Sequence, residues 1–299
     1  METIAALIIG IPLILYSYLF VAQESFIFRP QPLTTETIEE AKKETPLAEE
    51  VTLITPDKTT LHGWFVRPDL VKPNLQKPAT TPVPLIIYFG GNSEEITWFT
   101  SISKNFEGFA VATLNYRGFG KSTGKAGESE FFRDSEFIYD TFSKLPEIDA
   151  TKIIIMGRSI GTCVAVHLSA NRKILGTVLL SPLDSMKAVA SKHMPFVPVG
   201  TLLRHNFNSL ELAPKVKTPL FTLIAEDDKI VPPKHSLRLA DAWQGVVRIK
   251  KYKDTHHNNI IHAGGLWDDI NKFIQELYSD EFFLKPKTEE NKPEKTRKE

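Results

Sequence analysis

The chain has 299 residues, of which 42% are hydrophobic, so it is long and apolar enough to build one large domain around a single core. Its 36 basic and 36 acidic residues give a formal net charge of zero, and their interspersed order argues against nucleic acid as a partner. The only cysteine, Cys163, excludes an intramolecular disulfide bond. The sequence carries no metal-type cluster of His and Cys, no P-loop and no dinucleotide fingerprint, so it predicts neither a metal nor a cofactor.

The N-terminal segment differs from the rest of the chain. Residues 4–22 contain no charged side chain, and as a helix they would span about 28 Å, close to the hydrocarbon thickness of a bilayer. Aromatic residues, which favour the membrane interface, gather near its downstream end at Tyr16, Tyr18, Phe20, Phe26 and Phe28. A cleaved signal peptide is the alternative, but no Lys or Arg precedes the apolar run and no good A-x-A site follows it. We therefore expect residues 1–23 to be a single-pass membrane anchor, and the sequence leaves open which side of the membrane the rest of the chain occupies.

A polar connector and a hairpin follow the anchor. Residues 24–49 have the composition of a linker, with a short helix near residues 35–43. Two strand-like runs, residues 51–55 and 61–66, flank the turn Pro56-Asp57-Lys58. This arrangement predicts an antiparallel hairpin at the start of the folded domain.

Beyond the hairpin, short apolar runs alternate with longer segments that have a helical pattern. The predicted strands cover residues 84–89, 109–115, 153–156, 176–180, 220–225 and 246–252. The predicted helices cover residues 97–104, 128–145, 160–171, 234–242 and 260–278. Repeated alternation of strand and helix predicts an α/β fold with a mostly parallel sheet and helices on both faces. The predicted domain covers residues 50–284, and residues 285–299, which include no hydrophobic side chain, are expected to be disordered.

One pentapeptide, Gly157-Arg158-Ser159-Ile160-Gly161, lies where a predicted strand turns into a predicted helix. A G-x-S-x-G nucleophile elbow requires this context, because its glycines allow a sharp turn that raises the serine at the tip. The N–H of Ile160 would then point from a helix N-terminus toward any oxyanion formed at Ser159. We therefore interpret Ser159 as a nucleophile, the alternative being a tight structural turn.

A serine hydroxyl becomes a good nucleophile only when a base removes its proton and a carboxylate orients that base. After such an elbow the acid and then the histidine follow along the chain, at the carboxyl ends of parallel strands. Two late strands have suitable residues directly after them: Asp227 and Asp228 after the first, His256 and His257 after the second. Asp184, after an earlier strand, is a further candidate acid.

A fourth stretch completes a family resemblance. Residues 115–122, Asn-Tyr-Arg-Gly-Phe-Gly-Lys-Ser, resemble a D-Y-R-G-Y-G-x-S turn with Asn115 in place of the aspartate. Together with the elbow and the acid and base loops, this turn makes the chain similar to serine hydrolases of the α/β-hydrolase superfamily. Within that superfamily it resembles the small-lid, often membrane-anchored group of bud-emergence-type proteins, lysophospholipid lipases and protein depalmitoylases. The matching stretches lie within roughly residues 25–280.

The resemblance implies an α/β-hydrolase fold and assigns the triad. The family's acid precedes a Val-Pro pair by three residues, which selects Asp228 over Asp227. The family's H-N-D loop selects His257 as the base, with His256 as its neighbour. Asp184 and His256 remain the alternatives for the acid and the base.

The resemblance also implies an oxyanion hole, with one departure from the family pattern. Where the group usually has F-H-G-N, this chain has Phe-Gly-Gly-Asn, so Gly90 replaces a histidine and its side-chain role is lost. Backbone donors at Gly91 or Asn92 would still form one half of the hole, and the N–H of Ile160 the other half.

An insertion at about residues 185–217 separates two predicted strands. Its apolar stretch Met194-Pro195-Phe196-Val197-Pro198-Val199, followed by Leu202-Leu203, is interrupted by prolines and predicts a short lid. These side chains would either line an acyl pocket or pack on the sheet edge.

An anchor and an apolar lid together favour a serine hydrolase that cleaves ester or thioester bonds of an acyl or lipid-like small molecule. A serine aminopeptidase with the same triad is the enzymatic alternative. A membrane-tethered, non-catalytic binding protein is the alternative of another class.

Overall fold

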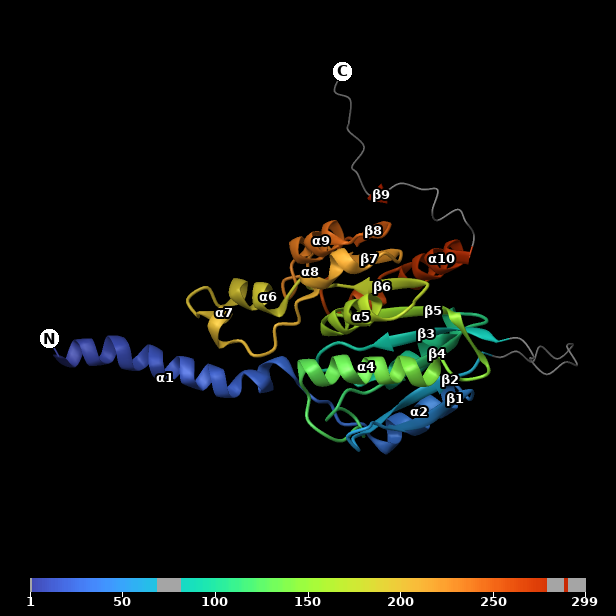
Figure 1. Cartoon of the computed structure of the whole chain (residues 1–299), viewed down its shortest axis with the longest axis horizontal. Helices are drawn as coiled ribbons and strands as arrows, with labels where there is room; N and C mark the ends of the chain where they lie inside the picture. The colour runs from blue at the N-terminus through green and yellow to red at the C-terminus, as the bar shows by residue number, and fades with distance from the viewer. Residues whose placement is uncertain (1, 69–81, 279–287, 290–299) are drawn as a thin grey trace, which may run out of the picture.

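The computed structural model describes residues 2–68, 82–278 and 288–289. They form one mixed sheet in the order β1-β2-β4-β3-β5-β6-β7-β8-β9, flanked by helices (Figure 1). Strand β2 pairs antiparallel with β1 and with β4, whereas the remaining neighbours pair in parallel. The predicted mostly parallel sheet is confirmed.

The strands lie close to their predicted positions. The hairpin consists of β1 (Ala48–Ile54) and β2 (Thr60–Val66). The central strands are β3 (Val83–Phe89), β4 (Ala110–Leu114), β5 (Ile148–Arg158), β6 (Gly176–Leu180), β7 (Leu220–Ala225) and β8 (Val247–Tyr252). Strands β4, β6 and β7 are buried at every residue, as expected of strands that are covered on both faces.

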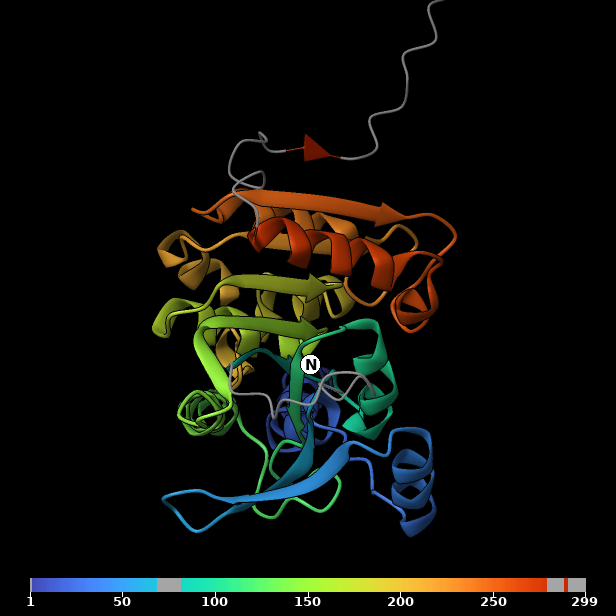
Figure 2. The ribbon, with the colours of Figure 1, turned by 90° about the vertical axis from the view of Figure 1, so that its right-hand side faces the viewer.

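Two helical layers cover the sheet (Figure 2). One layer, which contributes Phe131, Val164 and Leu239 to its core, comprises α4 (Glu128–Phe142), α5 (Ile160–Asn171) and α9 (Pro233–Ala242). The other layer, which contributes Ile38, Phe99 and Ile270 to a second core, comprises α2 (Thr35–Glu44), α3 (Phe99–Ile102) and α10 (Leu266–Tyr278). The sheet therefore separates two hydrophobic cores and is rigidly held between them.

Two predicted helices are wrong as single elements. The segment 260–278 is divided into the 3₁₀ turn η4 (Ile260–His262) and α10, because Gly264-Gly265 intervenes and Gly265 has a φ of +78°. The segment 97–104 is a succession of η1 (Ile96–Trp98), α3 and η2 (Ser103–Asn105). The predicted disorder of residues 285–299 lies outside the described residues, apart from β9 (Thr288–Glu289), which pairs with β8.

The N-terminal helix and the lid lie together at one end of the molecule. Helix α1 (Glu2–Ile27) projects from the domain beside α6 (Met186–His193) and α7 (Val199–Leu202) (Figure 1). The lid then returns to β7 through α8 (Ser209–Leu212) and η3 (Ala213–Lys215). Within α1, the segment Gly10–Ile27 is long and apolar enough to cross a bilayer, with a mean hydropathy of 1.3 and 11% of it buried. A signal sequence would meet the same criteria.

Candidate active site

Ser159 occupies the turn between β5 and α5. Its backbone has φ 51° and ψ −122°, a conformation that residues other than glycine rarely adopt. The strain is held in place by the N–H of Ser159, which donates to the carbonyl of Leu180 on β6 at 3.0 Å. A Cβ atom on Gly161 would lie 2.2 Å from the carbonyl oxygen of Phe89, so glycine alone allows α5 to approach β3 this closely. The turn therefore has the strained strand-to-helix geometry of a nucleophile elbow.

A continuous series of hydrogen bonds joins Ser159, His257 and Asp228. The Nε2 atom of His257 lies 2.9 Å from the Oγ atom of Ser159, and its Nδ1 atom lies 2.7 Å from Oδ2 of Asp228. The other carboxylate oxygen, Oδ1, accepts the N–H groups of Ile230 at 2.9 Å and Val231 at 2.7 Å. Because Asp228 and His257 are buried and Ser159 is partly exposed, the hydroxyl is the accessible end of the series. Such a series can activate a hydroxyl as a nucleophile.

The competing acids and bases lie in different surroundings. Asp227 and His256 are exposed, and each is adjacent to the residue that joins the series. Asp184 is buried but lies 3.0 Å from Nδ1 of His235 and pairs with Arg238. The structure therefore brings Asp228 and His257 to Ser159 and leaves these three alternatives apart from it.

The backbone donors around Ser159 are not equivalent. Ile160 is the first residue of α5, so its N–H has no carbonyl of a preceding helical turn to bind. The N–H of Gly91, by contrast, donates to Oε2 of Glu94 at 2.7 Å. The Oδ1 atom of Asn92 accepts the N–H groups of Arg29 at 2.8 Å and Ser93 at 3.0 Å, which fixes the loop after β3. Of the two donors expected in this loop, the N–H of Gly91 is therefore engaged by a carboxylate.

Sequence reasoning missed a buried glutamate behind the elbow. Oε2 of Glu94 accepts from Nη1 of Arg158 at 2.8 Å as well as from Gly91, and Oε1 accepts from Tyr88 at 2.6 Å and Trp98 at 2.9 Å. Glu94 is 8% exposed, and both oxygens of its carboxylate accept hydrogen bonds. The signal in the sequence was a Glu-Glu pair close after an apolar strand, in a chain whose elbow contains an arginine.

Arg158 extends this contact to His257. Its Nη2 atom donates to the carbonyl oxygen of His257 at 3.2 Å. Burial would lower the pKa of Arg158, but the charge of Glu94 and the hydrogen bond to it raise the pKa above its usual value. Arg158 is therefore a permanent cation, and the Glu94–Arg158 pair joins the loop after β3, the elbow and the His257 loop.

Ile96, with a smaller contribution from the same glutamate, accounts for the glycine at position 90. A Cβ atom on Gly90 would lie 2.7 Å from a methyl carbon of Ile96 and 3.3 Å from the carboxyl carbon of Glu94. The space next to Gly90 is thus already filled. The Gly90 carbonyl is also bound, since it accepts the hydroxyl of Tyr116 at 3.0 Å.

The fold and the elbow together define an α/β hydrolase. A mostly parallel sheet, a strained serine after β5, and the loops of Asp228 and His257 after β7 and β8 occur in the chain order of that class. The family model described as "Serine aminopeptidase, S33" matches residues 80–212. This span includes the elbow but ends before Asp228 and His257.

Relatives of known sequence and structure specify the class further. Protein bem46 of Schizosaccharomyces pombe is 25% identical over 280 residues, which cover 90% of this chain and 91% of that protein. An uncharacterized protein of Mycobacterium tuberculosis is 26% identical over 237 residues, or 77% of this chain and 80% of that protein. The fold is also similar to that of the Pyrococcus furiosus esterase Pf2001, with a TM-score of 0.63, 18% identity, and coverage of 84% of this chain and 99% of the esterase. Over most of its length the chain is thus similar to protein bem46, and its fold is that of the α/β hydrolases.

Proposed function

We propose that this protein is a membrane-anchored serine hydrolase that cleaves carboxylic ester or thioester bonds of acyl or lipid-like substrates. The observation that carries the proposal is the series of hydrogen bonds from Asp228 through His257 to Ser159. It ends at the tip of a strained elbow, where a substrate carbonyl can approach.

In the proposed mechanism Ser159 is the nucleophile and His257 the base. His257 takes the hydroxyl proton while Oγ of Ser159 bonds to the substrate carbonyl carbon, which becomes a tetrahedral oxyanion. As this intermediate collapses, the leaving alcohol or thiol takes the proton from His257, and an acyl-Ser159 ester remains. His257 then takes a proton from water while the water oxygen bonds to the acyl carbon. As the ester bond breaks, His257 returns the proton to Oγ of Ser159 and the acid is released. Asp228 orients the imidazole and stabilises its positive charge.

Two backbone donors would stabilise the oxyanion. The N–H of Ile160, at the N-terminus of α5, is the first. We assign the second to Asn92 rather than Gly91, because the Gly91 N–H is already bound by Glu94. This machinery uses only protein groups and requires no cofactor.

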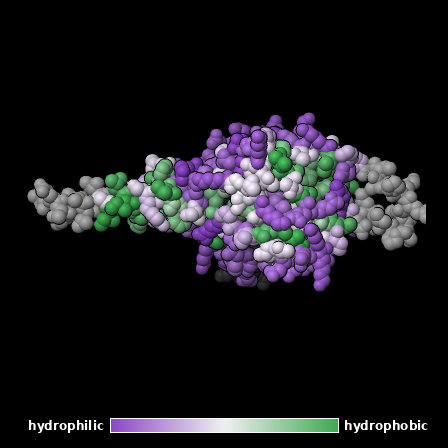
Figure 3. All heavy atoms as spheres, turned by 90° about the horizontal axis from the view of Figure 1, so that it is seen from below, coloured by the Kyte–Doolittle hydropathy of each residue, from purple (hydrophilic) through white to green (hydrophobic). Residues whose placement is uncertain are grey.

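The membrane part of the proposal rests on α1. Its segment Gly10–Ile27 has the length and hydropathy of a transmembrane helix, and hydrophobic residues gather along it outside the largely hydrophilic face of the domain (Figure 3). We propose that residues 1–23 form a single-pass anchor and residues 50–284 the catalytic domain, with residues 24–49 connecting them.

The matching family model also raises an aminopeptidase as a second candidate function. An aminopeptidase has to recognise a substrate ammonium group, for which a carboxylate is the usual partner. The cavity beside α1 and the lid includes neither Asp nor Glu among its lining residues. This lining favours an acyl substrate over an aminoacyl one.

An activity profile tests the proposal. The full-length protein in detergent should hydrolyse p-nitrophenyl esters and acyl thioesters, and a fluorophosphonate should label it at Ser159. The Ser159→Ala variant is the control and should show neither property. Efficient cleavage of proline or arginine aminoacyl amides, without ester or thioester turnover, would favour the aminopeptidase. Absence of every activity and of labelling would favour a non-catalytic binding protein.

A further inference from the structure

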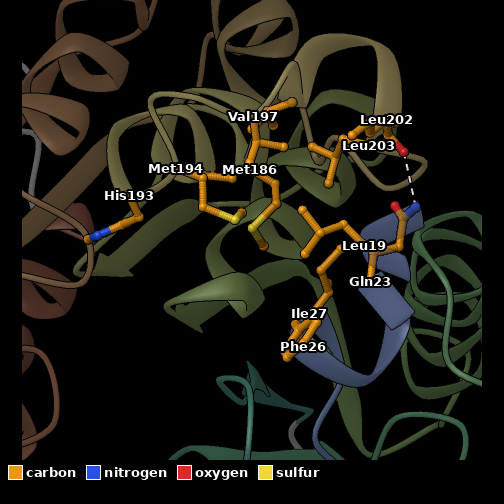
Figure 4. A pocket seen from close by; sticks show the side chains of 12 residues that line it. Leu19, Gln23, Phe26, Ile27, Met186, His193, Met194, Val197, Leu202 and Leu203 are labelled. Carbon is orange, nitrogen blue, oxygen red and sulfur yellow. Dashed lines mark hydrogen bonds between the residues drawn. The ribbon is translucent and has the colours of Figure 1, made fainter. Parts of the chain in front are cut away.

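A cavity of about 320 Å³ lies between α1 and the lid (Figure 4). Its volume is at the small end of the roughly 300–1,000 Å³ range of ligand sites. Leu19, Phe26 and Ile27 form the wall on the side of α1. Met186 and Val197 lie on the opposite, lid side. The cavity is therefore a hydrocarbon-lined space with walls from two segments far apart in the sequence.

Gln23 and His193, the polar residues among those that line this cavity, are already hydrogen-bonded to other groups of the protein. The Nε2 atom of Gln23 donates to the carbonyl of Leu202 at 3.0 Å, and its Oε1 atom accepts the N–H of Arg204 at 2.7 Å. The Nε2 atom of His193 donates to the carbonyl of Ile230 at 2.9 Å. A polar ligand would lose its hydration here without gaining these partners, whereas an apolar chain loses nothing. The lining thus selects for hydrocarbon.

Each wall is attached to a loop of the proposed catalytic site. On the side of α1, the N–H of Arg29, two residues beyond the helix, binds the side chain of Asn92. On the lid side, His193 binds Ile230, whose own N–H binds the carboxylate of Asp228. Hydrogen bonds thus connect the segments that line the cavity to the loop of the proposed oxyanion donor and to the loop of the proposed acid.

The walls of the cavity and the elbow share one hydrophobic core. Ile27 belongs to the same buried cluster as Ile160, the residue directly after Ser159. Met186 and Leu203 from the lid pack against that cluster. The walls of the cavity therefore rest on the same apolar core that holds the residue after Ser159.

We propose that this cavity binds the acyl chain of the substrate and that α1 forms one of its walls. The proposal rests on the function proposed above and adds a role for the N-terminal helix: it selects the substrate in addition to tethering the domain. Each methylene buried in such a site should raise kcat/KM by about fourfold until the cavity is filled.

The test compares chain-length profiles of the full-length protein in detergent micelles, with p-nitrophenyl esters from acetate to octanoate. In the native protein the ratio of kcat/KM for octanoate to that for acetate should be well above one. Leu19→Trp fills the cavity from α1 and Val197→Trp fills it from the lid. If each blocks two methylene positions, each should lower that ratio by about 16-fold.

Val21→Trp is the matched control, because Val21 lies two residues from Leu19 on the same helix and is 76% exposed. It should leave both esters and their ratio unchanged. A ratio that stays at the native value in Leu19→Trp and Val197→Trp would overturn the acyl-cavity proposal, as would an equal loss of turnover on both esters. Absence of acetate turnover and of fluorophosphonate labelling in the native protein would instead overturn the proposed hydrolase.

Discussion

The site around Ser159 and the region where α1 meets the lid are built in different ways. Around Ser159, side chains come from the ends of strands held between two cores, and buried charges bind one another there. At α1 and the lid, a few hydrogen bonds join two largely apolar segments, and Phe196 on the lid is 91% exposed. The first region has the precision that chemistry requires, and the second has the apolar, adaptable surface that suits selection of a substrate.

The largest effect on turnover is expected from a substitution in the site around Ser159. Ser159→Ala should lower kcat by at least about 10³-fold, while the fold is retained because a single oxygen is removed. Since the members of a triad act as a unit, adding Asp228→Asn to Ser159→Ala should cause little further loss. Ester turnover and circular dichroism of the two variants measure this, and retention of native turnover would refute the role of Ser159.

Adjacent histidines give the next contrast. His257→Ala should lower kcat by about 10²- to 10⁴-fold, the contribution typical of a general base. His256→Ala should have little effect, because His256 is exposed and lies outside the series that ends at Ser159. Steady-state kinetics of the two variants test this prediction. A larger loss of kcat in His256→Ala than in His257→Ala would assign the base to His256.

The Glu94–Arg158 pair should matter through positioning. Glu94→Gln keeps the shape but leaves the buried cation of Arg158 without its partner carboxylate, so the free energy of unfolding should fall by about 3–5 kcal/mol. Displacement of the elbow and the His257 loop should also lower kcat by about 10- to 100-fold, with little change in KM.

Glu95→Gln is the matched control for this pair. Glu95 neighbours Glu94 but binds Thr97 and Asn115 instead of Arg158. If Glu94→Gln lost stability while kcat stayed at the native value, the pair would be structural only.

Removal of residues 1–22 separates the two regions. The truncated protein should be soluble and still hydrolyse p-nitrophenyl acetate, because Ser159, His257 and Asp228 all lie in the sheet domain. Its preference for octanoate should fall, because Leu19 is lost from the cavity wall. Sedimentation and ester kinetics test both parts, and loss of the folded domain on truncation would make α1 a structural element instead.

The smallest expected effect concerns the reactivity of a cysteine thiol and not the turnover of a substrate. Cys163, in the helix behind Ser159, is 1% exposed, and burial raises the pKa of its thiol to about 12. At pH 8 iodoacetamide should therefore leave the native protein unlabelled. A cysteine introduced as Phe196→Cys on the lid should react readily, and urea should expose Cys163. Rapid labelling of native Cys163 would mean that the core behind the elbow opens.

Most of the sheet and the residues brought to Ser159 could be predicted from the sequence. Buried parallel strands appear as continuous apolar runs, and strands β6 and β7 have the predicted bounds. The family resemblance selected Asp228 and His257 from adjacent candidates, and these two lie in hydrogen-bond contact in the structure. The local pattern restricted the choice to two adjacent pairs, because each pair lies in a loop that follows a strand.

The remaining features depend on contacts that a local pattern does not contain. Glu94 and Arg158 are 64 residues apart, and no sequence pattern between them indicates that they are in contact. Gln23 and Leu202, which join α1 to the lid, are 179 residues apart. The break between η4 and α10 was missed for another reason: Gly264-Gly265 lies within a strongly periodic segment whose pattern favoured one long helix.

The contacts of the backbone just after α1 restrict how far Ser159 can move relative to the end of that helix. The N–H of Arg29 binds Asn92, and the carbonyl of Gln31 accepts the N–H of Gly120 at 2.8 Å. The chain thus joins the domain directly after α1, without a flexible linker that would let Ser159 reach a large volume. With α1 inserted in a bilayer, Ser159 would stay at a nearly constant height above the lipid headgroups. Ser159 could then reach bonds that lie close to the membrane surface. It could not reach acyl groups attached to a part of a protein that lies far from the membrane.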